Sequence, residues 1–137
     1  MLSKHDIQKL EDYWINHNEY KKRLRYREWE LLYPYQEADT NIGGGKSNTI
    51  TDSTAMRATI FINDALYQRL KRTTEVITKL YDQLDKEQQK IVQMRYWDKD
   101  GCYEWEEIAE ELFMSRSKVL RKRNAIIDKT AELLGWI

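Results

Sequence analysis

The sequence predicts an all-α protein, and three observations indicate this fold class. Apolar residues recur at helical spacing along most of the 137 residues. Pro34 is the single proline, and three of the five glycines fall together at positions 43–45. Glu, Lys, Leu and Gln, which favour helix, are abundant. We expect two parts: a helical interaction region over residues 1–83 and a C-terminal domain over residues 84–137.

The N-terminal region begins with two predicted helices. Ser3 is a good N-cap residue, and Asp6 places an acid in the first turn, where it suits the helix dipole. The apolar face of this helix consists of Ile7, Leu10 and Trp14. A break is expected at residues 16–18, and a second helix over residues 20–33, since the residue before Pro34 disfavours helical backbone. The second helix carries an apolar side of Tyr20, Leu24 and Leu31 and a basic cluster of Lys21, Lys22, Arg23, Arg25 and Arg27.

Residues 34–52 are polar and glycine-rich, which predicts a loop, and a long helix should follow from about Ser53. Five aliphatic residues and one threonine have heptad spacing along it: Leu66, Leu70, Thr73, Ile77, Leu80 and Leu84. Such a stripe can form a homodimer or pack on the N-terminal helices of its own chain. We favour the second arrangement because the heptads are few.

The run NIGGGKSNT, residues 41–49, ends like a phosphate-binding loop. A Walker loop, however, requires a glycine at position 40, where this chain has threonine, and no buried strand precedes the run. The plain interpretation is a flexible turn between helices. A second interpretation stays open, in which backbone N–H groups and Lys46 hold a phosphate of DNA.

Several classes of function find no support in the sequence. Cys102 is the single cysteine, which indicates an unreactive thiol in an intracellular protein. No catalytic group of carboxylates or of His, Ser and Asp stands at useful spacing, and no metal-binding pattern appears. We therefore expect neither an enzyme nor a bound cofactor or metal. The sequence has no apolar run that could span a membrane and no signal peptide, so we expect a cytoplasmic protein without a membrane partner.

The C-terminal third predicts a helix-turn-helix. Asp85 can cap one helix, and DKDG at residues 98–101 indicates a turn. A short helix then buries one face, and Ser115 caps a final helix anchored by Val119 and Ile126. The face of the short helix is Trp105, Ile108, Ala109 and Leu112. Two positions depart from the usual motif: Phe113 stands where the turn favours glycine, and Lys122 stands where an apolar residue is common.

Charge divides sharply across this motif. Residues 98–111 carry seven acidic side chains and one lysine, whereas residues 115–129 carry six basic side chains and one aspartate. Double-stranded DNA repels the first segment and attracts the second. The final helix is therefore predicted to enter the major groove.

Individual residues of this helix have different expected roles. Arginine can bind guanine and asparagine can bind adenine through paired hydrogen bonds, and leucine can touch a thymine methyl. Cations at other positions are expected to contact phosphates. The predicted DNA-binding residues are Ser115, Arg116, Ser117, Lys118, Leu120, Arg121, Lys122, Arg123 and Asn124, with phosphate contacts assigned to Lys118, Lys122 and Arg123.

Two family resemblances extend these predictions. Leu84, IVQMRY at 91–96, EEIAEEL at 106–112 and MSRSKV at 114–119 resemble region 4 of bacterial σ70-type factors, which implies a helix-turn-helix that reads promoter DNA. DTNIGGGKS at 39–47, together with the order of the helices, resembles the RinA family and the related ArpU group. This second resemblance implies a phage-encoded transcriptional activator of late packaging and lysis genes, acting in the bacterial host.

The favoured hypothesis is thus a sequence-specific activator whose N-terminal helices self-associate or contact RNA polymerase. The exposed acids Glu106, Glu107, Glu110 and Glu111 are a candidate polymerase contact or simply a solubilising face. The alternative is a DNA-packaging protein similar to a terminase small subunit, in which the same motif recognises a packaging site.

Overall fold

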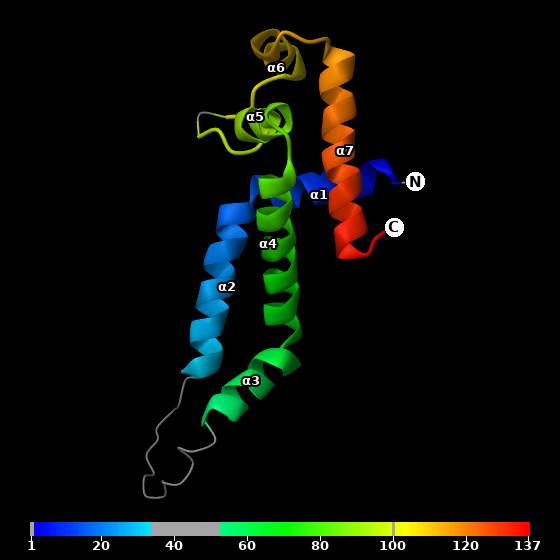
Figure 1. The fold of residues 1–137 in the computed structure, drawn as a ribbon. Coiled ribbons are helices and arrows are strands. Elements are labelled where there is room, and N and C mark those ends of the chain that lie inside the picture. The colour runs from blue at the N-terminus through cyan, green and yellow to red at the C-terminus, as the bar shows by residue number, and fades with distance from the viewer. Residues whose placement is uncertain (1, 34–52, 100) are drawn as a thin grey trace, which may run out of the picture. The chain divides into compact units, whose positions relative to one another are not determined.

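The computed structural model describes residues 2–33, 53–99 and 101–137, and within these ranges the chain forms helices only (Figure 1). The all-α prediction is therefore confirmed. The helices are α1 (Lys4–Ile15), α2 (His17–Leu32), α3 (Ser53–Asn63), α4 (Ala65–Gln83), α5 (Lys86–Arg95), α6 (Trp105–Leu112) and α7 (Arg116–Leu134). The predictions for the glycine-rich run and for Pro34 fall outside the described residues.

The residues group into two compact units. One contains Met1–Asn18 and Arg72–Ile137, and the other contains Glu19–Lys71. We call them the terminal unit and the middle unit. The first helix thus packs with the C-terminal helices rather than with its neighbours in sequence. The sequence analysis placed a domain boundary after residue 83, and the two compact units have different bounds. The boundary at residue 83 therefore stays a prediction about where the functions of the chain divide.

Local hydrogen bonds define α1 as the sequence indicated. The Ser3 hydroxyl accepts a bond from the Asp6 backbone N–H, and the Asp6 carboxylate accepts one from the Ser3 N–H, each at 3.1 Å. This capping box satisfies two backbone donors at the helix start. The predicted break is also confirmed, since α1 ends at Ile15 and Asn16 caps it. The second helix begins at His17, three residues before its expected start.

The main core of the terminal unit brings together α1, α4, α5 and α7. Its buried residues are Leu10, Trp14, Ile77, Leu80, Val92, Tyr96, Ile126, Ile127 and Ala131. Trp14 is fully buried. Its indole N–H donates to the Thr130 hydroxyl over 3.0 Å, and its carbonyl accepts from the Trp97 indole over 2.7 Å. Trp14 therefore contributes a large apolar surface without leaving its polar atom unpaired.

The heptad stripe packs within its own chain where it lies in the terminal unit. Ile77 and Leu80 are buried in the same core as Leu10 and Trp14 of α1. This supports the intramolecular arrangement favoured above. Leu66, at the other end of the stripe, is exposed.

The long helix expected from Ser53 is wrong, because two helices occupy that stretch. The Asp64 carboxylate accepts a 2.8 Å bond from the Tyr67 backbone N–H, which makes it an N-cap that separates α3 from α4. Arg27 of α2 holds the same carboxylate with two hydrogen bonds, of 3.0 and 2.6 Å. These donors, Arg27 first, lower the pKa of Asp64 below its ordinary value. In the middle unit, Asp64 thus joins the α3–α4 junction to α2 through charged hydrogen bonds.

We predict that Trp14→Ala lowers the free energy of unfolding by about 3–5 kcal/mol, because it leaves a cavity in the main core and removes the hydrogen bond from the indole to the Thr130 hydroxyl. Urea denaturation followed by circular dichroism measures the change. Trp29→Ala is the matched control, since Trp29 is exposed and its loss should cost less than about 0.5 kcal/mol. Equal effects of the two substitutions would contradict the packing described.

Candidate nucleic-acid interface

A second, smaller cluster joins α5, α6 and α7. Its buried residues are Ile91, Ile108, Ala109 and Val119, and the side chains packed against it are Met94, Trp105, Leu112 and Met114. The face predicted for the short helix is thus the face that α6 buries. Ala109 is buried in this cluster, where its small side chain leaves room for the neighbouring helix.

The starts of α5 and α7 are fixed by side chains. Asp85 forms a capping box with Gln88, in which Asp85 accepts a backbone bond over 2.7 Å. The Ser115 hydroxyl accepts a 3.1 Å bond from the Lys118 backbone N–H. Both caps are confirmed. In the segment predicted to turn, Gly101 has φ +111° and its N–H is bonded to the Asp98 carbonyl. Asp100 itself lies outside the described residues.

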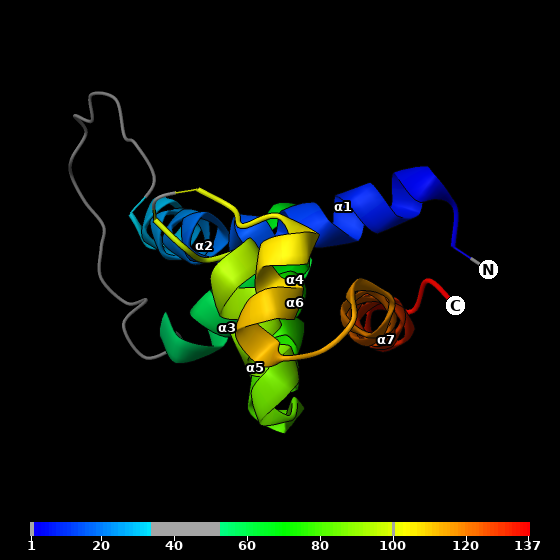
Figure 2. The ribbon, with the colours of Figure 1, turned by 90° about the horizontal axis from the view of Figure 1, so that it is seen from above.

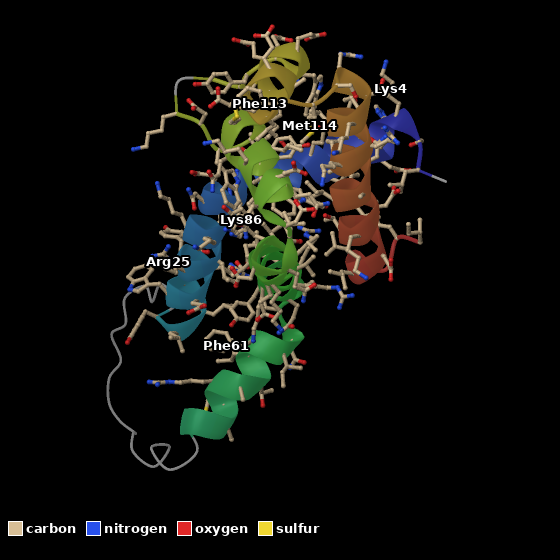
Figure 3. All side chains as sticks on the ribbon, turned by 45° about the horizontal axis from the view of Figure 1, so that its top comes forward. Lys4, Arg25, Phe61, Lys86, Phe113 and Met114 are labelled. Atoms are coloured by element: carbon tan, nitrogen blue, oxygen red, sulfur yellow. The ribbon has the colours of Figure 1, made fainter. Side chains whose placement is uncertain are left out.

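The connection from α6 to α7 is a tight left-handed turn at Phe113, labelled with Met114 in Figure 3. Phe113 has φ +55° and ψ +45°, and it is the one residue other than glycine with positive φ in the part of the chain described. Its side chain is 95% exposed. The left-handed conformation lets the Phe113 and Met114 N–H groups bond back to the last turn of α6. A strained, solvent-exposed aromatic therefore occupies a position that suits glycine.

These contacts set α6 crosswise to α7. Figure 2 looks along the axis of α7, and α6 lies across the view. The long α7 passes through both clusters: Val119 anchors its first half in the small cluster, and Ile126, Ile127 and Ala131 anchor its second half in the main core. Its outward face is therefore fixed by burial on the opposite side.

The acidic helix α6 uses part of its charge within the terminal unit. Glu106 pairs with Arg116 at 2.9 Å, with both side chains exposed. Glu107 accepts the Glu104 backbone N–H over 2.9 Å and so caps its own helix. Glu110 and Glu111 are exposed and form no ion pair with the residues that the structure describes.

Four of the predicted DNA-binding residues form one exposed face on the first half of α7. They are Ser117, Lys118, Arg121 and Asn124. Among the described residues, neither Lys118 nor Arg121 has an ion-pair partner, while Asn124 accepts a hydrogen bond from its neighbour Arg123. Arg116 is also exposed, Leu120 is half-buried, and Ser115 caps the helix. We call Ser117, Lys118, Arg121 and Asn124 the outward face of α7.

Lys122, which was expected to contact a phosphate, instead forms ion pairs within its own chain. Its ammonium lies 3.0 Å from the carboxylates of both Asp85 and Glu87, at the start of α5. The hydrogen bonds that Lys122 donates, the one to Glu87 first, raise the pKa of its ammonium. Burial raises the pKa of Asp85, but bonds from Gln88 and Lys122 outweigh it and leave that pKa lowered. Lys122 thus ties α7 to α5, which explains a lysine where an apolar residue is common.

Arg123 is likewise directed toward its own chain. Its guanidinium is 3.0 Å from Glu11 of α1, and both side chains are only 18% exposed. The same guanidinium lies over the Trp105 ring, 5.2 Å from its centroid, and Glu11 also accepts the Tyr96 hydroxyl over 2.6 Å. Glu11 is more than a hundred residues away in the chain, and sequence spacing gave no signal of this contact. The assignment of Lys122 and Arg123 to phosphates stays untested, and their environments favour positioning of α7 instead.

Other sites do not emerge from the described ranges. No group of three or more His, Cys, Asp or Glu side chains there could hold a metal ion. Of the helices described, none combines the length and apolar character that crossing a bilayer requires.

Fold and site together define an all-helical protein that presents a polar, cationic face on its last helix. The chain belongs to the family described as protein of unknown function (DUF722), whose model matches residues 1–132. It is similar to a protein of Staphylococcus phage phi11 named transcriptional activator rinA, with 25% identity over 129 residues that cover 94% of this chain and 90% of the relative. No solved structure matches the chain. The resemblance to the RinA family is thus supported as a distant similarity, and that to σ70 region 4 stays a prediction.

We predict that Phe113→Gly raises the free energy of unfolding by about 1 kcal/mol, because glycine adopts the left-handed conformation without the steric cost of a side chain. Little packing is lost, since the ring is exposed. Gly135→Ala is the opposite control: Gly135 has φ +82° at the end of α7, and alanine there should lower stability by about 1 kcal/mol. Urea denaturation tests both, and a destabilised Phe113→Gly would show that the ring has a role in the isolated fold.

A second prediction separates two arginines two positions apart. Arg123→Ala should lower the free energy of unfolding by about 2 kcal/mol, because Glu11 loses a charge-assisted hydrogen bond and Trp105 loses one of its two guanidinium contacts. Arg121→Ala should change it by less than about 0.5 kcal/mol, since that side chain is exposed. Thermal and urea unfolding of the two variants provide the comparison, and similar losses would contradict the inward placement of Arg123.

Proposed function

We propose that this protein is a phage-encoded transcriptional activator that binds a specific double-stranded DNA site through a helix-turn-helix formed by α6 and α7. The observation that carries the proposal is the outward face of α7. It presents an arginine, a lysine, an asparagine and a serine to solvent, at the end of the helix where such motifs read bases. The name of the phage phi11 relative, transcriptional activator rinA, supports the activator role.

In this proposal α7 lies in the major groove. Arg121 donates two hydrogen bonds to a guanine edge, and Asn124 pairs with an adenine edge after releasing its bond to Arg123. Lys118 contacts a phosphate, and the N-terminus of α7 adds the favourable end of its dipole. Arg116 exchanges Glu106 for a phosphate, which costs little because that surface pair is exposed.

Lys122 and Arg123 act at a distance from the DNA in this scheme. Their ion pairs with α5 and α1 hold α7 in register, so that the outward face keeps one orientation. The set of DNA-contacting residues proposed from the sequence thereby divides into a reading group on the outward face and a positioning group behind it.

The activator role requires a second contact. Glu110 and Glu111 are exposed on the acidic helix α6, whereas the residues that read DNA in this proposal lie on α7. The two carboxylates suit a basic surface of RNA polymerase. Late packaging and lysis genes are the proposed targets, following the resemblance to the RinA family.

We predict that Arg121→Ala weakens binding to the operator by about 1–3 kcal/mol and relaxes discrimination at one base pair. Footprinting on the phage's own DNA identifies the operator, and gel-shift titration with single base-pair changes measures discrimination. Lys129→Ala is the matched control on the same helix, because Lys129 pairs with Glu132 three turns beyond Lys118.

Operator binding that survives Arg121→Ala with unchanged discrimination would refute the placement of α7. The activator role is tested separately, by run-off transcription from the footprinted promoter. A protein that binds a packaging site and leaves transcription unchanged would be a packaging component similar to a terminase small subunit.

A further inference from the structure

The middle unit exposes a row of aromatic rings on α2. Tyr26, Trp29 and Tyr33 are 61%, 55% and 60% exposed. Their ring centroids follow one another at 6.1 and 6.0 Å, so the three form a continuous ladder. Large aromatic side chains are mostly buried in proteins, and a contiguous exposed group indicates an interaction surface.

Cations accompany these rings on the same helix. Lys21, Lys22, Arg23 and Arg25 are exposed, and none of them forms an ion pair with a residue in the described ranges. Arg25 projects outward from α2 in Figure 3. By contrast, Arg27 is engaged by Asp64 and by Glu30. Arg23 lies over the Tyr20 ring, 5.7 Å from its centroid. The helix thus carries one arginine held by two ion pairs, and four exposed cations that form none with a described residue.

The spacing places a cation in line with the rings. Lys22, Tyr26, Trp29 and Tyr33 stand at positions i, i+4, i+7 and i+11, which is one face of an α-helix. The centre of a protein–protein interface is depleted of lysine and other charges. A lysine in the row, with further cations beside it, instead suits a ligand that offers flat apolar rings and negative charge together. Unpaired nucleobases on a phosphodiester chain have this chemistry.

We infer that this face of α2, defined by Lys22, Tyr26, Trp29 and Tyr33 with the adjacent cations, binds single-stranded nucleic acid. The rings stack on successive bases, and the cations neutralise phosphates. Stacking requires bases that are not already stacked in a duplex, so this ligand differs from the one proposed for α7. Affinity should depend little on base sequence, because every base has a ring face to offer.

The experiment measures binding of the full chain to fluorescently labelled oligothymidine by anisotropy. Trp29→Ala should weaken binding by about fivefold or more, the lower limit for loss of one stacked base. Trp29→Phe should retain most of the affinity because it keeps a ring. Lys22→Ala should reduce the slope of log affinity against log salt concentration by about 0.7.

Phe113→Ala is the matched control, since it removes another highly exposed aromatic ring from elsewhere in the chain and should leave oligothymidine affinity unchanged. Oligouridine is the second ligand. The same pattern of variants with both strands supports a site for bases and phosphates in general, and the pattern with one strand alone assigns the site to that strand.

Unchanged oligothymidine affinity in Trp29→Ala would overturn the inference. If that variant instead shifted the protein from dimer to monomer in analytical ultracentrifugation, the face would be a contact between two copies of the chain. A failure of the α7 proposal can be told apart from a failure of this inference. Arg121→Ala is tested for binding to the duplex operator, whereas the Trp29 variants are tested for binding to single strands.

Discussion

The burial of Trp14 is the constraint on which the arrangement of the terminal unit depends. Its side chain fills the space between the first helix and the last, and its indole N–H reaches Thr130 in the second half of α7. Because Val119 anchors the first half of α7 in a separate cluster, the helix is held at two places along its length. A helix held in this way cannot rotate, so the residues left outside are determined by those buried inside.

Helical phase then divides the basic residues of α7 into two groups. Arg121 and Arg123 have the same charge and stand two positions apart in the sequence. Because each helix position turns the side chain by about 100°, the two arginines point to nearly opposite sides of α7. Arg121 consequently faces solvent, whereas Arg123 meets Glu11 and the Trp105 ring. The total charge of a segment therefore indicates only whether it would attract a polyanion. Which of its cations could contact that polyanion depends on which face of the helix is buried.

Features set by neighbouring residues were predictable from the sequence, and those set by distant partners were not. The caps at Ser3, Asp85 and Ser115 and the apolar face of α6 depend on spacing within one turn or two, and all are present. The N-cap at Asp64 was also local, but the continuous heptad pattern concealed it. The pairing of Glu11 with Arg123 joins opposite ends of the chain, which periodicity within either helix cannot reveal.

The formal net charge of zero conceals two cationic surfaces, because acids are matched with particular bases rather than with all of them. Asp64 engages Arg27, Glu11 engages Arg123, and Asp85 with Glu87 engages Lys122. Among the cations that form no ion pair with a described residue are Lys118 and Arg121 on the outward face of α7, and four more on α2. Arginine and asparagine side chains match the hydrogen-bonding edges of paired bases, whereas exposed rings match the faces of unpaired bases. The side chains that accompany each set of cations are thus the basis for proposing two different ligands, which net charge alone would not separate.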